Sequence, residues 1–248
     1  MLSPFESGWR KLRGRPLLPP LWLRRHAGPV DRFESAAADC RSLLRDWVGL
    51  ESLRSLLDLG CGPGAMALAL APDLLPDSRY VGIDVHAPSI AWCRHAFARD
   101  ARFRFEVVDV RSAYGQGTAP IGEYRLPAGD GETDLVIAKS LFTHLSREEA
   151  ERYLSEIARV LSPGGRAMVT AFLFAAAPVP AFPYGDSDVR WKRRDRPAAA
   201  MAFARARFEA MIGAAGLAIE RSELGFYPGE ARIPTGQDVL LLRRAGGR

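Results

Sequence analysis

Short apolar runs and longer amphipathic segments take turns along the first two thirds of the chain. The apolar runs predict strands over 55–59, 79–85, 102–110, 133–141 and 166–174. The amphipathic segments predict helices over 31–47, 64–71, 88–99 and 147–161. Because strands that alternate with helices form a mainly parallel sheet covered on both faces, this order predicts a doubly wound α/β domain.

Helix ends carry a second local signal. Asp31 with Glu34, and Ser146 with Glu149, have the spacing of a capping box, in which a side chain and the backbone at a helix start satisfy each other's hydrogen bonds. The sequence "SPGG" at 162–165 should end the helix that Ser146 begins.

Two segments interrupt the alternation. Residues 111–132 carry five glycines and two prolines, which indicates a long surface loop, and loops of that length are commonly functional. Residues 175–200 mix prolines, aromatics and arginines without a period, so we expect a lid or insertion there.

The last part of the chain predicts a helix over 202–216 and then two strands, 217–227 and 236–244, with no helix between them. Consecutive strands without a crossover helix form an antiparallel pair. The elements together predict a seven-stranded, mainly parallel sheet whose last strand is antiparallel.

Length and composition fit one domain with additions. We expect a basic, proline-rich N-terminal arm over 1–30 and a domain over 31–248 that carries the lid. Apolar residues make up 48% of the chain, and no apolar stretch approaches the roughly 20 residues of a membrane span. The first thirty residues lack the apolar core of a secretory signal, so we expect a cytoplasmic protein.

Cysteine and charge refine this picture. Cys40, Cys61 and Cys93 lack metal-ligand spacing, which predicts free thiols in a reducing compartment and no zinc site. The net charge is +5, with basic clusters at 10–25 and 190–196. Such clusters are either solvated faces or contacts for a polyanion.

The stretch "SLLDLGCGPGA" at 55–65 places a glycine loop directly after the first predicted strand. Gly60 and Gly62 permit a tight turn and close approach of the backbone to a ligand. Asp84 ends the second strand, where it can accept hydrogen bonds from ribose hydroxyls. These features fit both a nicotinamide dinucleotide and S-adenosylmethionine, because both cofactors contain adenosine.

Three features separate the two cofactors. Asp58, just before the glycines, would repel a pyrophosphate, whereas it would attract the α-ammonium group of S-adenosylmethionine. Asp109, at the end of the third strand, can accept from an adenine amino group while the next backbone N–H faces the ring. The closing antiparallel pair is the third feature, and all three favour S-adenosylmethionine, with no metal.

Five blocks occur in order over about residues 53–174: "LLDLGCGPG", "GIDVHAPSI", "VVDV", "DLVIAKSLFTHL" and "ARVLSPGGRAMVT". On these blocks the chain resembles the class I S-adenosylmethionine-dependent methyltransferases, which share a seven-stranded sheet with an antiparallel last strand. "SLFTHL", the long loop and the terminal "GQDVLLLRR" are similar to a broad group of bacterial small-molecule methyltransferases.

The resemblance implies a role for each matched residue. It assigns the methionine part of the cofactor to Asp58, Gly60, Cys61 and Gly62, the ribose to Asp84, the adenine face to Val85, and the adenine edge to Asp109 and Val110. Lys139, at the rim of the fourth strand, would act as a cation toward the cofactor or the acceptor.

Methyl transfer mainly requires alignment and desolvation, and a hydroxyl or protonated amine acceptor also requires a base. His144, beside the fourth strand, is the candidate base, because a histidine ring titrates near neutral pH. It is also placed to fix the strand-to-helix turn by a backbone hydrogen bond, or to contact the substrate. Tyr184, Arg190 and Trp191 suit a planar or acidic acceptor, or they pack the lid.

We therefore expect methyl transfer from S-adenosylmethionine to a hydroxyl or amine of a small-molecule acceptor. Two alternatives stay open. RNA methylation would use the basic arm and "RWKRR", although we do not expect nucleic acid as the partner, and the chain could instead bind S-adenosylmethionine without catalysis.

Overall fold

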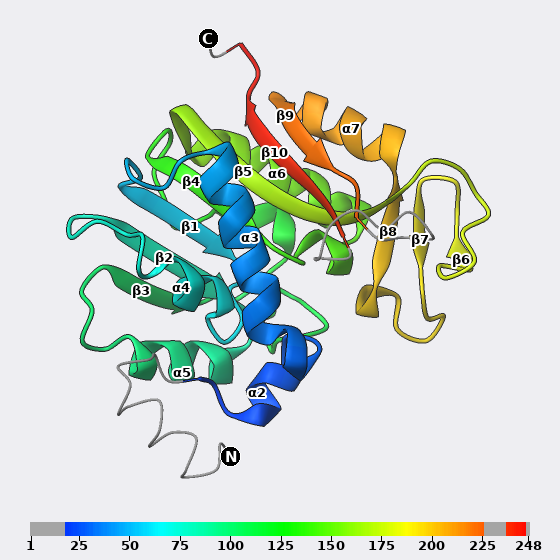
Figure 1. The fold of residues 1–248 in the computed structure, drawn as a ribbon. Coiled ribbons are helices and arrows are strands. Elements are labelled where there is room, and N and C mark those ends of the chain that lie inside the picture. The colour runs from blue at the N-terminus through cyan, green and yellow to red at the C-terminus, as the bar shows by residue number, and fades with distance from the viewer. Residues whose placement is uncertain (1–17, 226–236, 247–248) are drawn as a thin grey trace.

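From β1 to β5, strands and helices follow one another along the chain in the order that the sequence predicts (Figure 1). The computed structural model describes residues 18–225 and 237–246, so residues 1–17 of the expected arm lie outside the described part. The described sheet contains ten strands, and its main part runs β3-β2-β1-β4-β5-β10-β9. The bounds of these seven strands are β1 Ser55–Leu59, β2 Arg79–Asp84, β3 Phe103–Val107, β4 Thr133–Ala138, β5 Leu161–Phe174, β9 Leu217–Glu223 and β10 Asp238–Arg244.

The five strands from β1 to β5 are parallel, whereas β10 is antiparallel to both of its neighbours, β5 and β9. The prediction of a mainly parallel sheet with an antiparallel last strand is confirmed. Since the parallel strands run in one direction, their carboxyl ends meet at one edge of the sheet, which is where doubly wound folds bind their ligands.

Helices cover both faces of the sheet, because successive side chains of a strand point to opposite sides. Leu56 belongs to a buried cluster with α3, α4 and α5, and the next residue, Leu57, belongs to a second cluster with α6 and α7. Helix α3 crosses in front of the sheet in Figure 1, and α6 lies behind it. The helix bounds are α2 Leu21–His26, α3 Phe33–Trp47, α4 Ala65–Leu70, α5 Ala87–Ala96, α6 Arg147–Val160 and α7 Arg205–Ala214.

Local signals decide some helix ends and not others. Ser146 Oγ accepts a hydrogen bond from Glu149 N–H, and the Glu149 carboxylate accepts one from Ser146 N–H, so this capping box is confirmed. The capping box predicted at Asp31 is wrong. A 3-10 turn, Val30–Arg32, leads into α3, and no side chain caps the start of that helix.

The helix predicted over 202–216 is wrong at its start. Residues Met201–Ala204 form strand β8, which pairs with the end of β5, and α7 begins only at Arg205. Phe203 of β8 is fully buried and meets the ring of Phe208 at a centroid distance of 5.3 Å. Pairing with β5 and burial of this ring therefore outweigh the helical pattern of the segment.

Part of the insertion at 175–200 forms strands of the sheet. It contains two short strands that extend the sheet beyond β8, namely β6 (Tyr184–Gly185) and β7 (Val189–Trp191). The turn between them is held to α6, because the guanidinium of Arg147 lies 3.7 Å from the carboxylates of both Asp186 and Asp188.

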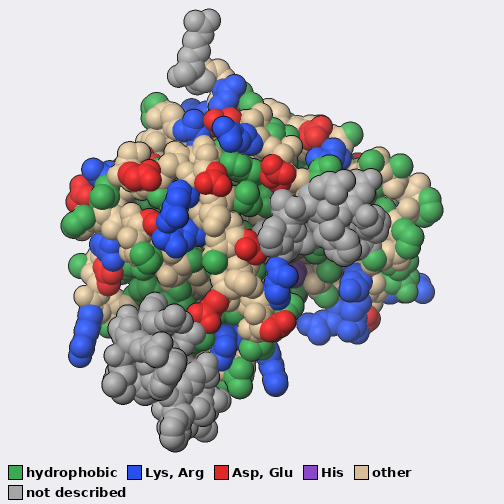
Figure 2. Space-filling model, viewed as in Figure 1, with side chains coloured by type: hydrophobic (Ala, Val, Ile, Leu, Met, Phe, Trp, Pro, Cys, Tyr) green, Lys and Arg blue, Asp and Glu red, His purple; other side chains and the backbone are tan. Residues whose placement is uncertain are grey.

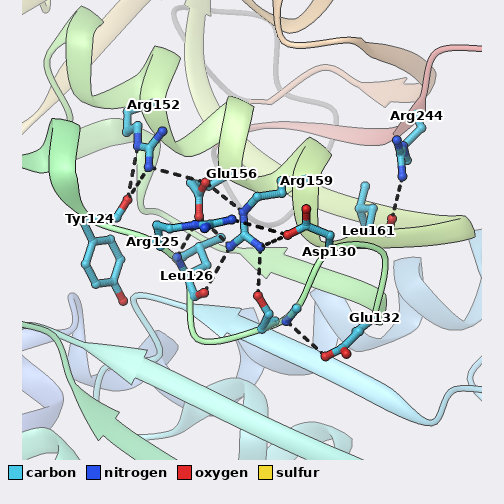
Figure 3. A network of polar contacts seen from close by, with 12 residues as sticks. Tyr124, Arg125, Leu126, Asp130, Glu132, Arg152, Glu156, Arg159, Leu161 and Arg244 are labelled. Carbon is cyan, nitrogen blue, oxygen red and sulfur yellow. Dashed lines mark hydrogen bonds and ion pairs between the residues drawn. The ribbon is translucent and has the colours of Figure 1, made fainter.

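The second half of the loop over 111–132 is anchored to α6 (Figure 3). Arg159 donates to the Leu126 carbonyl at 3.2 Å and to the Asp130 carboxylate at 2.7 Å. Glu156 accepts from Leu126 N–H at 2.8 Å. Burial alone would raise the pKa of Glu156, but hydrogen bonds from Arg159 and Leu126 outweigh it, so the pKa lies below its usual value. The charged pair therefore fixes this half of the loop.

Replacing Ser146 by alanine removes the oxygen that caps α6. We expect the Ser146→Ala variant to lose about 1 kcal/mol of unfolding free energy in urea denaturation. Ser42→Ala is the matched control, because Ser42 is exposed within α3 and its hydroxyl only donates back to the Ala38 carbonyl at 3.1 Å. An equal loss in both variants would contradict a specific role of the cap.

Candidate active site

A glycine loop at the carboxyl end of β1 turns toward the end of β2. Gly60, Gly62 and Gly64 have φ values of +70°, +51° and +84°, which residues with a side chain rarely adopt. The N–H groups of Gly60 and Cys61 both donate to the Ile83 carbonyl, at 2.9 and 3.0 Å. The turn thus requires glycine, and hydrogen bonds fix it to the neighbouring strand.

Asp84, the last residue of β2, joins two elements that border the site. One carboxylate oxygen accepts from Gly62 N–H at 2.7 Å, and the other accepts from His86 N–H at 2.8 Å. His86 immediately precedes α5, so one side chain holds both the glycine loop and the start of that helix. A carboxylate has about four acceptor positions, so Asp84 keeps capacity for ribose hydroxyls.

Asp58 lies beneath the loop. It is 1% exposed and accepts a hydrogen bond from the hydroxyl of Tyr80, which is itself fully buried. Burial raises the pKa of Asp58 to about 7, while the Tyr80 hydrogen bond and the charge of Lys139 act in the opposite direction. Lys139 therefore lies near enough to lower the pKa of this carboxyl. Contact of Asp58 or Lys139 with a cofactor stays a prediction.

Two thiols hold the glycine loop, one from within the loop and one from α5. Cys61 and Cys93 are buried, and both donate to the Gly62 carbonyl, at 3.6 and 3.5 Å. Burial raises the pKa of the Cys61 thiol well above its usual value, so the sulfur stays protonated and acts as a donor. All three cysteines are free, as the sequence predicts.

The residues predicted to contact adenine are covered by the long loop. Val85 follows β2, and Asp109 and Val110 follow β3. A Cβ added to Gly115 would lie 2.7 Å from the Val85 side chain, and one added to Gly117 would lie 2.5 Å from the Val110 nitrogen. Backbone of the loop therefore packs directly on two of these positions.

His144, at the end of the 3-10 turn Phe142–His144, is held by two partners. Its Nδ1 lies 2.9 Å from the Ala198 carbonyl oxygen and 3.0 Å from the Tyr114 hydroxyl. Because a carbonyl only accepts, Nδ1 carries a proton, which leaves the lone pair on Nε2 in the neutral ring. Burial lowers the pKa of His144, and the hydrogen bond to Ala198 acts in the opposite direction, so the ring is neutral at pH 7.

The described part of the N-terminal arm packs over the same edge of the sheet. His26 of α2 stacks on His86 at a centroid distance of 3.8 Å and meets the Tyr114 ring edge-on at 5.8 Å. A Cβ added to Gly62 would lie 3.8 Å from the Ala27 side chain. The arm therefore lies against the glycine loop.

The predicted substrate residues lie on the β6–β7 hairpin. Arg190 donates to three backbone carbonyls of residues 182–186, at 2.7, 2.7 and 3.3 Å. Trp191 packs against the buried cluster that contains Leu57 and residues of α6 and α7. Tyr184 is 40% exposed. The hairpin uses Arg190 and Trp191 for its own structure, and contact of these residues with a substrate stays a prediction.

Three residues of this edge are not singled out by the sequence analysis. Tyr114 lies in the glycine-rich loop, which the sequence does mark as functional, and His26 lies in the arm without a motif around it. Ala198 contributes only a carbonyl oxygen, so no side-chain signal could have identified it.

Within residues 18–225 and 237–246, no group of three or more His, Cys, Asp or Glu side chains could hold a metal ion. No helix in that part of the chain is long and apolar enough to span a membrane.

Comparison with known proteins adds to this geometry. Residues 56–165 match a family model described as a methyltransferase domain. Demethylmenaquinone methyltransferase from Thermus thermophilus is 32% identical over 146 residues, which cover 58% of this chain and 59% of that protein. The chain spans between 27% and 59% of the length of three curated relatives it matches.

Solved structures share the fold at low identity. The 1,6-didemethyltoxoflavin-N1-methyltransferase of Burkholderia thailandensis, solved with its substrate and S-adenosylhomocysteine, has a TM-score of 0.56 at 18% identity and covers 93% of this chain and 94% of its own. The [4+2]-cyclase SpnF has a TM-score of 0.60 at 22% identity and covers 85% of this chain and 82% of its own.

The match over residues 56–165, together with the sheet order and the glycine loop, supports the resemblance to the class I S-adenosylmethionine-dependent methyltransferases that the motifs indicate. The residues present fit this cofactor on its methionine and ribose side, where three left-handed glycines and Asp84 form the edge. On the adenine side the fit requires Gly115 and Gly117 to move away from Val85 and Val110.

Replacing Asp58 by asparagine tests the buried carboxyl. The pKa of Asp58 rises from its usual 3.8 to about 7 on folding, so between these values the folded chain keeps a proton that the unfolded chain has lost. The free energy of unfolding therefore falls as pH rises through this window, and Asp58→Asn should show a shallower fall in denaturation series from pH 5 to pH 7.

Asp77→Asn is the control, because Asp77 is exposed and pairs only with Arg54 at 2.9 Å. It should keep the slope of the parent chain. Identical slopes for the parent and Asp58→Asn would show that the Asp58 carboxyl is ionised in the folded chain.

Proposed function

We propose that the chain transfers a methyl group from S-adenosylmethionine to a hydroxyl or amine of a small-molecule acceptor. The observation that carries the proposal is the glycine loop fixed by Asp84 at the carboxyl edge of the sheet, next to a histidine with a defined tautomer. The methyltransferase match and the small-molecule enzymes among the structural neighbours support it.

The cofactor would supply a methyl group on a sulfonium, which an acceptor attacks in line. Residues of the chain then align the acceptor, exclude water and remove a proton. His144 suits the last task, because the hydrogen bond to Ala198 places its proton on Nδ1 and leaves Nε2 to accept one. Leu141 places this segment beside the glycine loop, with its side chain 3.5 Å from where a Cβ on Gly60 would lie.

The parts added to the core would shape the acceptor site. Within the domain over 31–248, Ala198 of the insertion at 175–200 and Tyr114 of the long loop both contact His144. The ring of His26 at the same edge of the sheet supports a planar acceptor, which would stack on it.

Cofactor choice is tested by isothermal titration. We expect S-adenosylmethionine and S-adenosylhomocysteine to bind and NAD to show no heat of binding, because residues 56–165 match a methyltransferase domain. Binding of NAD without S-adenosylhomocysteine would overturn the proposal.

Replacing His144 by asparagine tests the base. The asparagine amide can replace the Nδ1 donor to Ala198 but offers nothing in place of Nε2. We expect the His144→Asn variant to lose about 100-fold or more in turnover while S-adenosylhomocysteine still binds. Turnover is measured as S-adenosylhomocysteine release with a panel of hydroxylated and amino aromatic acids.

His95→Asn is the matched control, because His95 is exposed at the end of α5 and has no contact with His144. Full turnover in both variants would contradict a base role for His144. No release with any acceptor in the parent chain would favour a protein that binds the cofactor without catalysis.

RNA methylation is the second candidate, on one observation. Figure 2 shows Lys and Arg side chains gathered at the lower end of the β6–β8 unit, where Lys192, Arg194 and Arg196 are exposed. If they bind RNA, the affinity for transfer RNA should fall steeply with salt, and replacing these three residues by glutamine should flatten the dependence. Weak binding that salt does not change would exclude this candidate.

A further inference from the structure

We propose that residues 111–119, the gate segment, close the adenine subsite while the cofactor is absent. The backbone of this segment then takes the place of the adenine ring. The inference rests on the proposed cofactor. It concerns how that cofactor gains access to its site.

The gate segment uses the hydrogen-bonding group that adenine would use. Thr118 N–H donates to Asp109 Oδ1 at 2.8 Å, the carboxylate assigned to the adenine amino group. Arg111 N–H donates to the Ala119 carbonyl at 2.9 Å and closes the base of the segment into a turn. The amide of Thr118 therefore occupies an acceptor position of Asp109, as an adenine N–H would.

Two glycines let the backbone reach the adenine positions. A Cβ on Gly117 would lie 2.3 Å from the Val110 oxygen and 2.5 Å from its nitrogen, and a Cβ on Gly115 would lie 2.7 Å from the Val85 side chain. These distances are too short for any side chain. The gate segment in this position occupies the space that a purine between Val85 and Val110 would need. The two therefore exclude each other.

Tyr114 connects the gate segment to three other elements. Its hydroxyl contacts His144 Nδ1 at 3.0 Å and donates to the Ala198 carbonyl at 3.2 Å. Its ring meets His26 of the arm edge-on at 5.8 Å and His144 at 4.8 Å. These contacts are few and partly exposed, so the segment can open without unfolding the core.

The rest of the loop would stay in place when the gate segment moves. Leu126 is tied to Glu156 and Arg159 of α6 through both its N–H and its carbonyl. Residues 111–119 make no contact of this kind with α6 within the described chain. The boundary between moving and fixed parts lies near the 3-10 turn Ile121–Glu123.

A closed gate lowers the apparent affinity for cofactor, because only the open fraction binds. Gly117→Ala places a methyl group against Val110 and disfavours the closed form alone. If about one chain in ten is open, this variant should bind S-adenosylhomocysteine about tenfold more tightly, with a faster association rate in stopped-flow tryptophan fluorescence.

Gly122→Ala is the matched control in the same loop. A Cβ there would meet nothing within 4 Å, and neither Gly117 nor Gly122 has a positive φ, so the two substitutions differ in the clash and not in backbone strain. Its affinity should equal that of the parent chain. Equal or weaker binding by a folded Gly117→Ala variant would overturn the proposal.

Hydrogen exchange of the unmodified chain gives a second test that needs no variant. Ligands usually slow amide exchange near their site. Here S-adenosylhomocysteine should speed exchange at Thr118, because its amide loses the Asp109 acceptor when the gate opens. Slower or unchanged exchange at Thr118 in the complex would refute the gate. Failure of the ligand to bind any form of the chain would instead refute the proposed function.

Discussion

The Asp84 carboxylate is the interaction on which the site depends. Its two oxygens pair with backbone N–H groups of Gly62 and His86, which belong to two different connections of the sheet. Unpaired, these groups would leave the glycine loop and the start of α5 without a common anchor. Ala27 of the arm and Leu141 after β4 border this loop, since each lies within van der Waals distance of where a Cβ on Gly62 or Gly60 would be.

The residues around His144 come from segments far apart in the sequence. His144 follows β4, Tyr114 follows β3, and Ala198 belongs to the insertion, yet the three meet within 3.2 Å. The carbonyl of Ala198 decides which nitrogen of His144 carries the proton. Because Tyr114 also belongs to the gate segment, opening the proposed adenine subsite would also change the surroundings of His144.

The elements with the strongest local signals were predictable. The strand over 55–59 has the predicted bounds, and the helix that Ser146 caps starts where its capping box indicates, since both patterns act within a few residues. Asp31 carries the same spacing but lies in a 3-10 turn that precedes α3. Residues 201–204 have a helical pattern, yet the free edge at the end of β5 offers them a partner strand.

The sequence by itself determined the sheet class, the glycine loop and the acids at the strand ends, because periodicity and glycine placement are local properties of the chain. Only the tertiary structure decided that Asp58 is buried against Tyr80, that His144 is held by a backbone carbonyl, and that Gly115 and Gly117 rest on Val85 and Val110. The physical reason is that burial, tautomer choice and close backbone approach depend on neighbours supplied by distant segments, and these leave no mark in the local pattern of residues.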